Sequence, residues 1–334
     1  MFSGRGRSVR VALFPVFCSL LSLGCGDALS MRLLVLGSGA GGGVPQWNCL
    51  CPQCRRAREE RDLPAAQKRF RRTQASIAVS EPGERWTLIN ASPDLCSQFA
   101  QAAELAPPEG ALRGSPLAGV ALTDGQLDHT TGLLFLREGT EIRIACTDPV
   151  WKSLNSTFPI VSVLRHFLPV ERSAYPAEFG GVRIEALSLP GAPAPYEAPS
   201  EEPGQVVALR LLGTKSGRRV AYAPGLPEIS DAFLAFVSGC DALFVDGTFW
   251  SEEELAPMSE ERRRSIRRSH LPVSGPEGSL ARLAKLPVAK KFYIHINNTN
   301  PMLDPDSPQA KEVREAGVQI AYDGMLLSFY PTDS

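Results

Sequence analysis

The sequence predicts a layered α/β protein with mixed β-sheets, formed as one domain by residues 31–334. Apolar runs of strand length alternate with helical segments along the chain, and several of the strands occur as hairpin pairs. The composition agrees with this prediction, because 43% hydrophobic and 21% charged residues are ordinary for a globular protein. A chain of 334 residues is also long enough to bury a large core.

The first part of this domain predicts a strand, a long loop, a hairpin and a helix. The apolar run MRLLVLG predicts a buried strand, and a loop rich in glycine and cysteine follows it. The next segment, 59–74, is charged and is expected to be exposed. ASIAVS and RWTLINAS predict two strands joined by the turn EPGE, and residues 93–105 predict a helix.

The remainder repeats this alternation of strands and helices. A proline-rich exposed loop is expected within 190–204, and the helical segment 149–167 is expected to break at Pro159. The expected strands are 117–124, 141–148, 180–189, 205–213, 218–225, 240–246, 290–295 and 318–330. The expected helices are 125–139, 149–167, 229–239 and 277–287.

Residues 1–30 are expected to lie outside this fold. Three arginines precede the apolar run Val11–Leu23 and small residues follow it, which is the layout of a secretory signal. The alternative is an over-extended gene start, since Met31 opens directly onto the first strand. We expect a cytoplasmic protein, exported only if residues 1–30 are a genuine signal. The apolar run is short and contains Pro15, so no stable membrane association is expected.

Charge and glycine spacing exclude two classes of partner. The formal net charge of −1 provides no basic footprint for nucleic acid. The glycines of residues 37–42 fit the spacing G-x-G-x-x-G after a strand, which is typical of dinucleotide sites. Such a site needs a helix directly behind the glycines, and here a proline and three cysteines follow instead. We therefore expect these glycines to allow close backbone packing.

Three cysteines at C-x-C-x-x-C spacing predict a structural zinc site in the loop 49–54. Cys49, Cys51 and Cys54 can occupy three corners of a tetrahedral zinc, with a fourth ligand from elsewhere in the chain. A disulfide between Cys51 and Cys54 is the alternative, but it leaves Cys49 unexplained. We interpret Cys96, Cys146 and Cys240, which lie in apolar segments, as buried thiols.

The four histidines are the candidates for a second metal site. His129, His295 and the acidic Asp246 each follow an apolar strand, where loops converge and ligands tend to bind in α/β sheets. His166 lies among apolar residues in a helical pattern and is expected to pack. His270 opens a turn, where a cap, a surface position and a position lining the site all remain open.

The string LTDGQLDHTTGLLFLREG resembles a degenerate form of the H-x-H-x-D-H signature of the metallo-β-lactamase superfamily. Asp124 and Gln126 stand in place of its first two histidines, whereas Asp128 and His129 match its last two residues. More specifically, the strings GGVPQWNCLCPQC, NASPDL, LDHTTGLL, VDGTFW, HLPVSG and HINNTNPMLD resemble the family of pyrroloquinoline quinone (PQQ) biosynthesis B proteins. This resemblance extends over nearly all of residues 31–334 and implies a four-layer αββα fold.

The histidine count then favours a single redox metal over a hydrolytic pair. A hydrolase of the superfamily holds two metals with about five histidines, and this chain has four in total. Asp128, His129 and His295, with Asp246 as an additional ligand, form the two-imidazole, one-carboxylate set of non-haem iron oxygenases. We therefore predict Fe²⁺ at this site, where other divalent metals can substitute.

The resemblance implies that the protein uses dioxygen to hydroxylate the tyrosine ring of a precursor derived from Glu-Tyr. A carrier that moves PQQ or its precursor to the periplasm is the alternative function, and a metal-dependent hydrolase or phosphodiesterase is a third. We assign His270 and Asp124 to the catalytic group, His270 for proton transfer or substrate contact. Relatives with the same cysteine cluster place its fourth ligand three residues after the last metal histidine, which is Asn298 here.

Eight polar residues lie near loop ends, in strings that resemble the family. Some of them are expected to line the substrate pocket. The eight residues are Arg72, Thr73, Gln74, Asn90, Ser92, Tyr222, Asn297 and Asn300.

Overall fold

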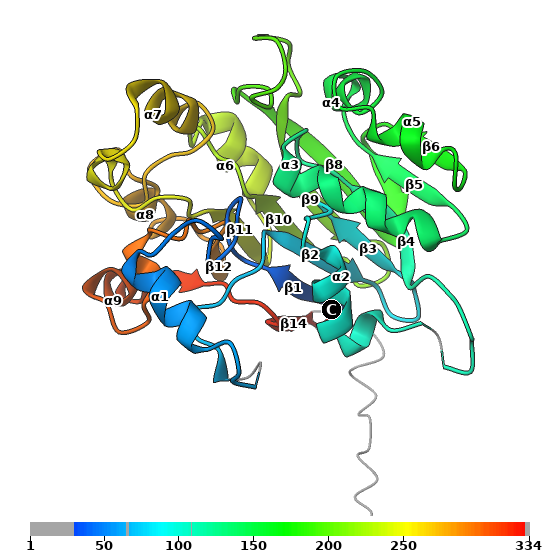
Figure 1. The fold of residues 1–334 in the computed structure, drawn as a ribbon, viewed down its shortest axis with the longest axis horizontal. Helices are drawn as coiled ribbons and strands as arrows, with labels where there is room; N and C mark the ends of the chain where they lie inside the picture. The colour runs from blue at the N-terminus through cyan, green and yellow to red at the C-terminus, as the bar shows by residue number, and fades with distance from the viewer. Residues whose placement is uncertain (1–29, 65–66, 108, 331–334) are drawn as a thin grey trace, which may run out of the picture.

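The computed structural model describes residues 30–64, 67–107 and 109–330, and it shows two β-sheets packed face to face with helices on both outer faces (Figure 1). The predicted four-layer αββα arrangement is therefore confirmed. The predictions made for the N-terminal extension fall on residues 1–29, which lie outside the described residues.

The first sheet has seven strands in the order β14-β1-β2-β3-β4-β5-β6. Pairing is antiparallel from β14 to β3 and parallel from β3 to β6, so the sheet is mixed as predicted. The antiparallel pair β2–β3 confirms the first predicted hairpin. The strands are β1 (Met31–Gly37), β2 (Ser76–Ser80), β3 (Trp86–Ile89), β4 (Leu117–Ala121), β5 (Ile142–Ala145), β6 (Val170–Ser173) and β14 (Leu326–Phe329).

The second sheet also has seven strands, in the order β13-β12-β11-β10-β9-β8-β7. Strands β10 to β13 are parallel and β7 to β10 are antiparallel, which confirms the predicted hairpin β9–β10. The strands are β7 (Ala177–Phe179), β8 (Val182–Leu189), β9 (Val206–Gly213), β10 (Arg219–Ala223), β11 (Ala242–Asp246), β12 (Lys290–Ile294) and β13 (Gln319–Ile320).

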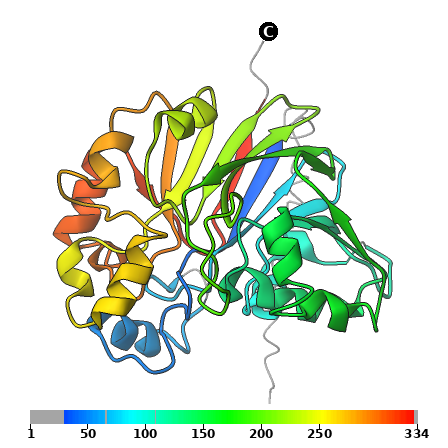
Figure 2. The ribbon, with the colours of Figure 1, turned by 90° about the horizontal axis from the view of Figure 1, so that it is seen from above.

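Helices cover the outer face of each sheet, and Figure 2 shows the two groups on opposite sides of the paired sheets. The first sheet carries α2 (Leu95–Gln101), α3 (Leu127–Thr130), α4 (Asp148–Ser153), α5 (Ile160–Leu164) and the 3₁₀ helices η3 (Ala103–Leu105) and η4 (Thr131–Glu138). The second sheet carries α1 (Pro52–Glu59), α6 (Asp231–Val237), α8 (Ser279–Leu283), α9 (Pro308–Glu315) and η6 (Pro301–Leu303). The segment between β11 and α8 contains η5 (Glu252–Leu255) and α7 (Glu260–Arg267).

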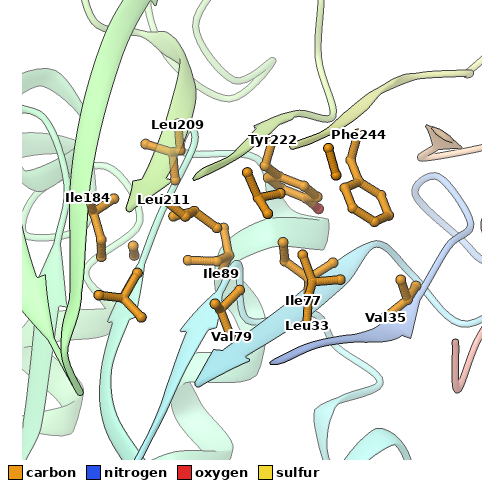
Figure 3. Packing of buried hydrophobic residues seen from close by; sticks show 14 of the residues in the cluster. Leu33, Val35, Ile77, Val79, Ile89, Ile184, Leu209, Leu211, Tyr222 and Phe244 are labelled. Atoms are coloured by element: carbon orange, nitrogen blue, oxygen red, sulfur yellow. The ribbon is translucent and has the colours of Figure 1, made fainter. Parts of the chain in front are cut away.

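Three hydrophobic clusters correspond to the three interfaces between the four layers. Successive side chains of a strand point to opposite faces, so each sheet supplies residues to two clusters. In β1, for example, Leu33 and Val35 face the second sheet, whereas Leu34 and Leu36 face the helices. In β10, Tyr222 packs between the sheets and Ala221 packs toward α6. Figure 3 shows this inter-sheet core.

The predicted strand 318–330 is the largest error in the sequence-based assignment. It is two strands in different sheets, β13 beside β12 and β14 beside β1. The chain crosses between the sheets at residues 321–325, where Gly324 has a φ of +84° that favours glycine. Apolar residues occur in both strands and in the crossing, at Ile320, Ala321, Met325 and Leu326, so hydrophobic content alone could not show where one strand ended and the other began.

Three further helices and two strands are absent from the sequence-based assignment, namely α1, α7, α9, β6 and β7. Two side chains also differ in burial from their predictions. His166 is exposed after the end of α5, so a packing role is wrong, and Cys96 is exposed on α2. Cys146 and Cys240 are buried as predicted. In the described part of the chain, no helix combines the length and apolarity needed to cross a membrane.

Candidate metal sites

The loops after two strands bring together the side chains of the first candidate site. Asp128 and His129 lie on α3, in the loop after β4, and His295 is the residue after β12. These two strands belong to different sheets, β4 to the first and β12 to the second, so the site lies where the loops at the carboxyl ends of both sheets meet. One ligand-type atom from each of the three residues lies within 4.8 Å of the other two.

The distances among these atoms suit the coordination shell of one metal ion. Asp128 Oδ2 lies 3.1 Å from His295 Nε2 and 3.9 Å from His129 Nε2. With metal–ligand bonds near 2.0–2.2 Å, neighbouring ligand atoms stand roughly 3–4 Å apart. His129 Nε2 is buried and has no hydrogen-bond partner among the described residues. A metal ion would satisfy this nitrogen, so the residues fit a bound metal.

Asp124 holds the ring of His129 from behind. Its two carboxylate oxygens lie 2.9 and 2.8 Å from His129 Nδ1, and Thr123 donates a hydrogen bond to the same carboxylate. This contact fixes the tautomer that leaves Nε2 free for a metal. Burial lowers the pKa of His129, but the charges of Asp124 and Asp128 outweigh burial and raise it to about 9. Asp124 is thus placed to position His129 rather than to bind the metal.

Asp246, His270 and His295 form a second group of ligand-type atoms within 4.8 Å of one another. Asp246 is the last residue of β11, and its Oδ2 lies 2.7 Å from His270 Nδ1. The rings of His270 and His295 stack with centroids 5.3 Å apart. Burial lowers the pKa of His270, but the Asp246 carboxylate outweighs burial and raises it above its usual value. This second group shares His295 with the first.

Thr248, which was not among the site residues expected from the sequence, contacts residues of both groups. Its Oγ1 lies 2.6 Å from Asp246 Oδ1 and 2.9 Å from His295 Nδ1. If the imidazole donates to the hydroxyl and the hydroxyl donates to the carboxylate, His295 Nε2 is left free to bind a metal. His295 itself has a φ of +58°, an unfavourable backbone conformation for a residue with a side chain. The one feature of the sequence that could have indicated Thr248 as a site residue is its position two residues after Asp246, the aspartate at the end of β11.

A cavity of about 560 Å³ opens beside the Asp/His centre, which is a size typical of small-molecule sites. Its apolar lining comes mainly from the loop after β8 and from the segment before and within α7, and includes Pro195, Val206, Leu255, Met258 and Ile266. Its polar lining includes Gln126, Glu261, Ser265 and Asn297. The same cavity is lined by Asp128, His129 and His295, so it gives a small molecule access to the candidate metal centre.

Of the eight polar residues expected near the pocket, only Asn297 lines this cavity. Arg72 and Thr73 line a different cavity. Asn90 is buried behind the site, where its side chain binds Thr123. Tyr222 is buried in the inter-sheet core. The expectation that part of this set lines the pocket therefore holds for Asn297 alone, because proximity to a loop end does not specify which face of the loop a side chain occupies.

The cysteine cluster is a separate candidate metal site, apart from the Asp/His centre. The Sγ atoms of Cys49, Cys51 and Cys54 lie within 4.8 Å of one another, and all three thiols are free. Backbone amides donate to these sulfur atoms, from Cys51 to Cys49 at 3.4 Å and from Cys54 to Cys51 at 3.5 Å. Burial and the two neighbouring thiols raise the pKa of Cys51 to about 12. A bound cation would offset this cost, so the cluster fits a zinc ion.

Asn298 lies beside the cluster, as its proposed role as fourth ligand requires. Its Nδ2 is 3.4 Å from Cys54 Sγ and 3.8 Å from Cys51 Sγ, and its backbone oxygen accepts from Cys51 at 3.3 Å. In this orientation the amide nitrogen faces the sulfur atoms, and an N–H group donates to sulfur without binding a metal. The assignment of Asn298 as a ligand stays a prediction.

The fold and these two sites define the class of protein. Paired mixed sheets with outer helices, and a carboxylate–imidazole centre at the strand ends, are found in the β-lactamase superfamily, whose domain matches residues 85–296. A diphosphatase of the PhnP family shares the fold with a TM-score of 0.62 and 21% identity, over 91% of this chain and 99% of its own.

Within this superfamily, the chain belongs to the coenzyme PQQ synthesis protein B family. It is 43% identical over 308 residues to the coenzyme PQQ synthesis protein B of Methylococcus capsulatus, covering 88% of this chain and 99% of that relative. The crystal structure of Zn²⁺-bound PqqB from Methylobacterium extorquens matches with a TM-score of 0.76 and 34% identity. That match covers 89% of this chain and all of the other.

Proposed function

We propose that this protein is a metal-dependent enzyme of PQQ biosynthesis that hydroxylates the tyrosine ring of a Glu-Tyr-derived precursor. The names of its relatives support the pathway. The hydroxylation chemistry is supported by one observation. Two imidazoles, His129 and His295, and one carboxylate, Asp128, lie together, and the buried Nε2 of His129 has no hydrogen-bond partner among the described residues. This ligand set is typical of iron(II) oxygenases, which keep open positions for substrate and dioxygen.

We assign the metal to the first group, held by Asp128, His129 and His295. The two groups share His295, so the described residues do not supply two independent ligand sets. Asp246 and His270 remain paired at 2.7 Å next to that site. A bound iron(II) would supply the activation of dioxygen, whereas zinc in the cysteine cluster would be structural.

The residues around the metal would bind the substrate, transfer a proton and orient the metal ligands. The apolar side of the cavity, with Leu255, Met258 and Ile266, binds the substrate ring and keeps water away from it. His270, held by Asp246, moves a proton to or from the phenol oxygen of the substrate. Asp124 and Thr248 keep His129 and His295 in the tautomers that metal binding needs.

The test is a hydroxylation assay with protein reconstituted with iron(II) under anaerobic conditions. Glu-Tyr, ¹⁸O-labelled dioxygen and ascorbate are added, because one oxygen atom enters the ring and the other needs two electrons to become water. The expected product carries one labelled oxygen on the ring, as measured by mass spectrometry. Zinc-reconstituted protein and the His129→Ala variant are the controls and should form none.

The outcomes also separate the alternative functions. Absence of product together with tight binding of PQQ would replace the proposal with a carrier function. Cleavage of a phosphodiester substrate by metal-loaded protein would replace it with a hydrolase function.

A further inference from the structure

A second cavity, of about 530 Å³, lies apart from the Asp/His centre and shares no lining residue with its cavity. It is bounded by α2, by the segment 68–73 and by the crossing 322–324 between the two sheets. Its volume is within the range of small-molecule sites. Neither the ligand sets nor the proposed reaction uses these residues.

Arg72 is the buried cation of this cavity. It is only 9% exposed, and among the described residues its guanidinium makes one hydrogen bond, from Nη1 to the backbone oxygen of Arg71 at 2.8 Å. Its Nε is buried without a hydrogen-bond partner, and no ion pair of Arg72 occurs within the described part of the chain. A guanidinium has five N–H donors, so most of its capacity is unused.

The neighbouring carboxylate does not neutralise this guanidinium by contact. Asp323 accepts four hydrogen bonds from the backbone and hydroxyl groups of Ser38 and Thr73, two at each oxygen. Glu60 similarly accepts from the backbone amides of residues 69–71. Both carboxylates attract Arg72 at longer range, but their oxygens are already bound to other donors.

Two further cations line the same cavity. Lys68 and Arg71 are half-buried, and neither forms an ion pair with any residue that the structure describes. Within the described part of the chain, the Arg71 side chain donates only to the backbone oxygen of Ala57, at a long 3.4 Å. Glu104 lies at the exposed rim as the one further acidic lining residue besides Asp323. The interior of the cavity therefore presents positive charge without a bound counter-charge.

We propose that this cavity is a second ligand site, which binds a small anion through a carboxylate or phosphate group held by Arg72, Arg71 and Lys68. The planar guanidinium fork matches the oxygens of either group in a two-point contact. Burying an unpaired cation is costly, and a bound anion removes that cost. Arg72 pairs through its backbone with Val44, at 2.8 and 2.9 Å, so an occupied site also stabilises the start of the cysteine loop.

Isothermal titration of the zinc-loaded full-length chain with inorganic phosphate and, separately, with glutarate tests this site. One saturable site is expected for at least one probe, and the two titrations show which group the cavity prefers. Binding should weaken at least tenfold, about 1.4 kcal/mol, in Arg72→Gln and in the double variant Lys68→Gln/Arg71→Gln. The double variant alters half-exposed side chains and decides the matter if Arg72→Gln does not fold.

Two controls locate the site. Arg69→Gln removes an exposed cation that pairs with Asp306 outside the cavity, and it should leave the affinity unchanged. His129→Ala should also leave the affinity unchanged, because it alters the metal centre and not this cavity. The proposal is overturned if neither probe shows saturable binding up to about 10 mM, an affinity limit near −3 kcal/mol. It is equally overturned if the double variant binds as tightly as the wild type, or if His129→Ala abolishes binding.

Discussion

The two candidate metal sites differ in where their ligands come from along the chain. The cysteine cluster takes three ligands from six consecutive residues of one loop. The Asp/His centre joins Asp128 to His295, which are 167 residues apart. The three thiols of the first site are therefore already close in sequence, although Asn298 from a distant segment also lies against them. The second exists only when both sheets have folded and packed together.

The sites also differ in how far they are organised without a metal. In the Asp/His centre, Asp124 and Thr248 already fix the orientation of His129 and His295. In the cysteine cluster, burial and the two neighbouring thiols raise the pKa of Cys51 to about 12, so its ionised form needs a cation. The orientation of the imidazoles is therefore set by the protein itself, whereas the ionised form of the cysteine cluster depends on a bound cation.

The largest expected effect follows removal of a ligand at the Asp/His centre. His129→Ala should reduce ring hydroxylation by at least roughly 1000-fold, because the metal's contribution of several kcal/mol is lost. Metal analysis should show loss of iron with zinc retained. His166→Ala, at an exposed histidine, is the matched control and should leave both unchanged. Retention of iron in His129→Ala would contradict the ligand assignment.

A smaller effect is expected at the paired His270. His270→Gln keeps a polar side chain beside Asp246 but removes the proton carrier, so turnover should fall by roughly 100-fold or more. Iron content should stay at the wild-type value, which separates proton transfer from metal binding. Equal losses of iron and of turnover would instead make His270 a metal ligand.

A still smaller effect is expected from substitution of Asp124, which would act on the metal only by orienting His129. Asp124→Asn should weaken iron binding by roughly 10–100-fold, because the orientation and tautomer of His129 are no longer fixed. Competition with a chelator measures this affinity. Asp148→Asn, at an exposed carboxylate, should have no effect. An unchanged affinity in Asp124→Asn would show that the contact with His129 Nδ1 does not matter.

The smallest effect on turnover is expected at the cysteine cluster. Cys51→Ala should abolish zinc binding and lower stability by about 3 kcal/mol, which corresponds to roughly 5–10 °C in Tm. The turnover of the folded fraction should change less than about twofold, since the ligands of the Asp/His centre are intact. Cys96→Ala, at an exposed thiol outside the cluster, is the control. A complete loss of turnover in folded Cys51→Ala would show that the two sites are coupled.

Much of the Asp/His centre could be predicted because its residues follow apolar strands. Asp128 and His129 follow β4, Asp246 ends β11 and His295 follows β12, and ligands tend to bind at such strand ends in α/β sheets. The meeting of the β4 loop with β11 and β12 depends on the packing of the two sheets. Thr248 was missed because a threonine has no distinctive metal chemistry, and its role depends on two neighbours from other parts of the chain. The cavity at Arg72 was missed for a similar reason, since segments from α2 and the sheet crossing create it.

Residue types and short-range spacing were thus sufficient to specify the strand and helix alternation, the cysteine cluster and the shortage of imidazoles. These properties depend on local chemistry, which is present in the chain before it folds. The division of 318–330 between two sheets, the contact of Asp124 with His129 and the buried Arg72 Nε without a hydrogen-bond partner required the folded chain. Each of these three features depends on which distant segments of the chain pack together. Many individually weak apolar contacts decide that packing, and no short stretch of sequence contains a pattern that reports it.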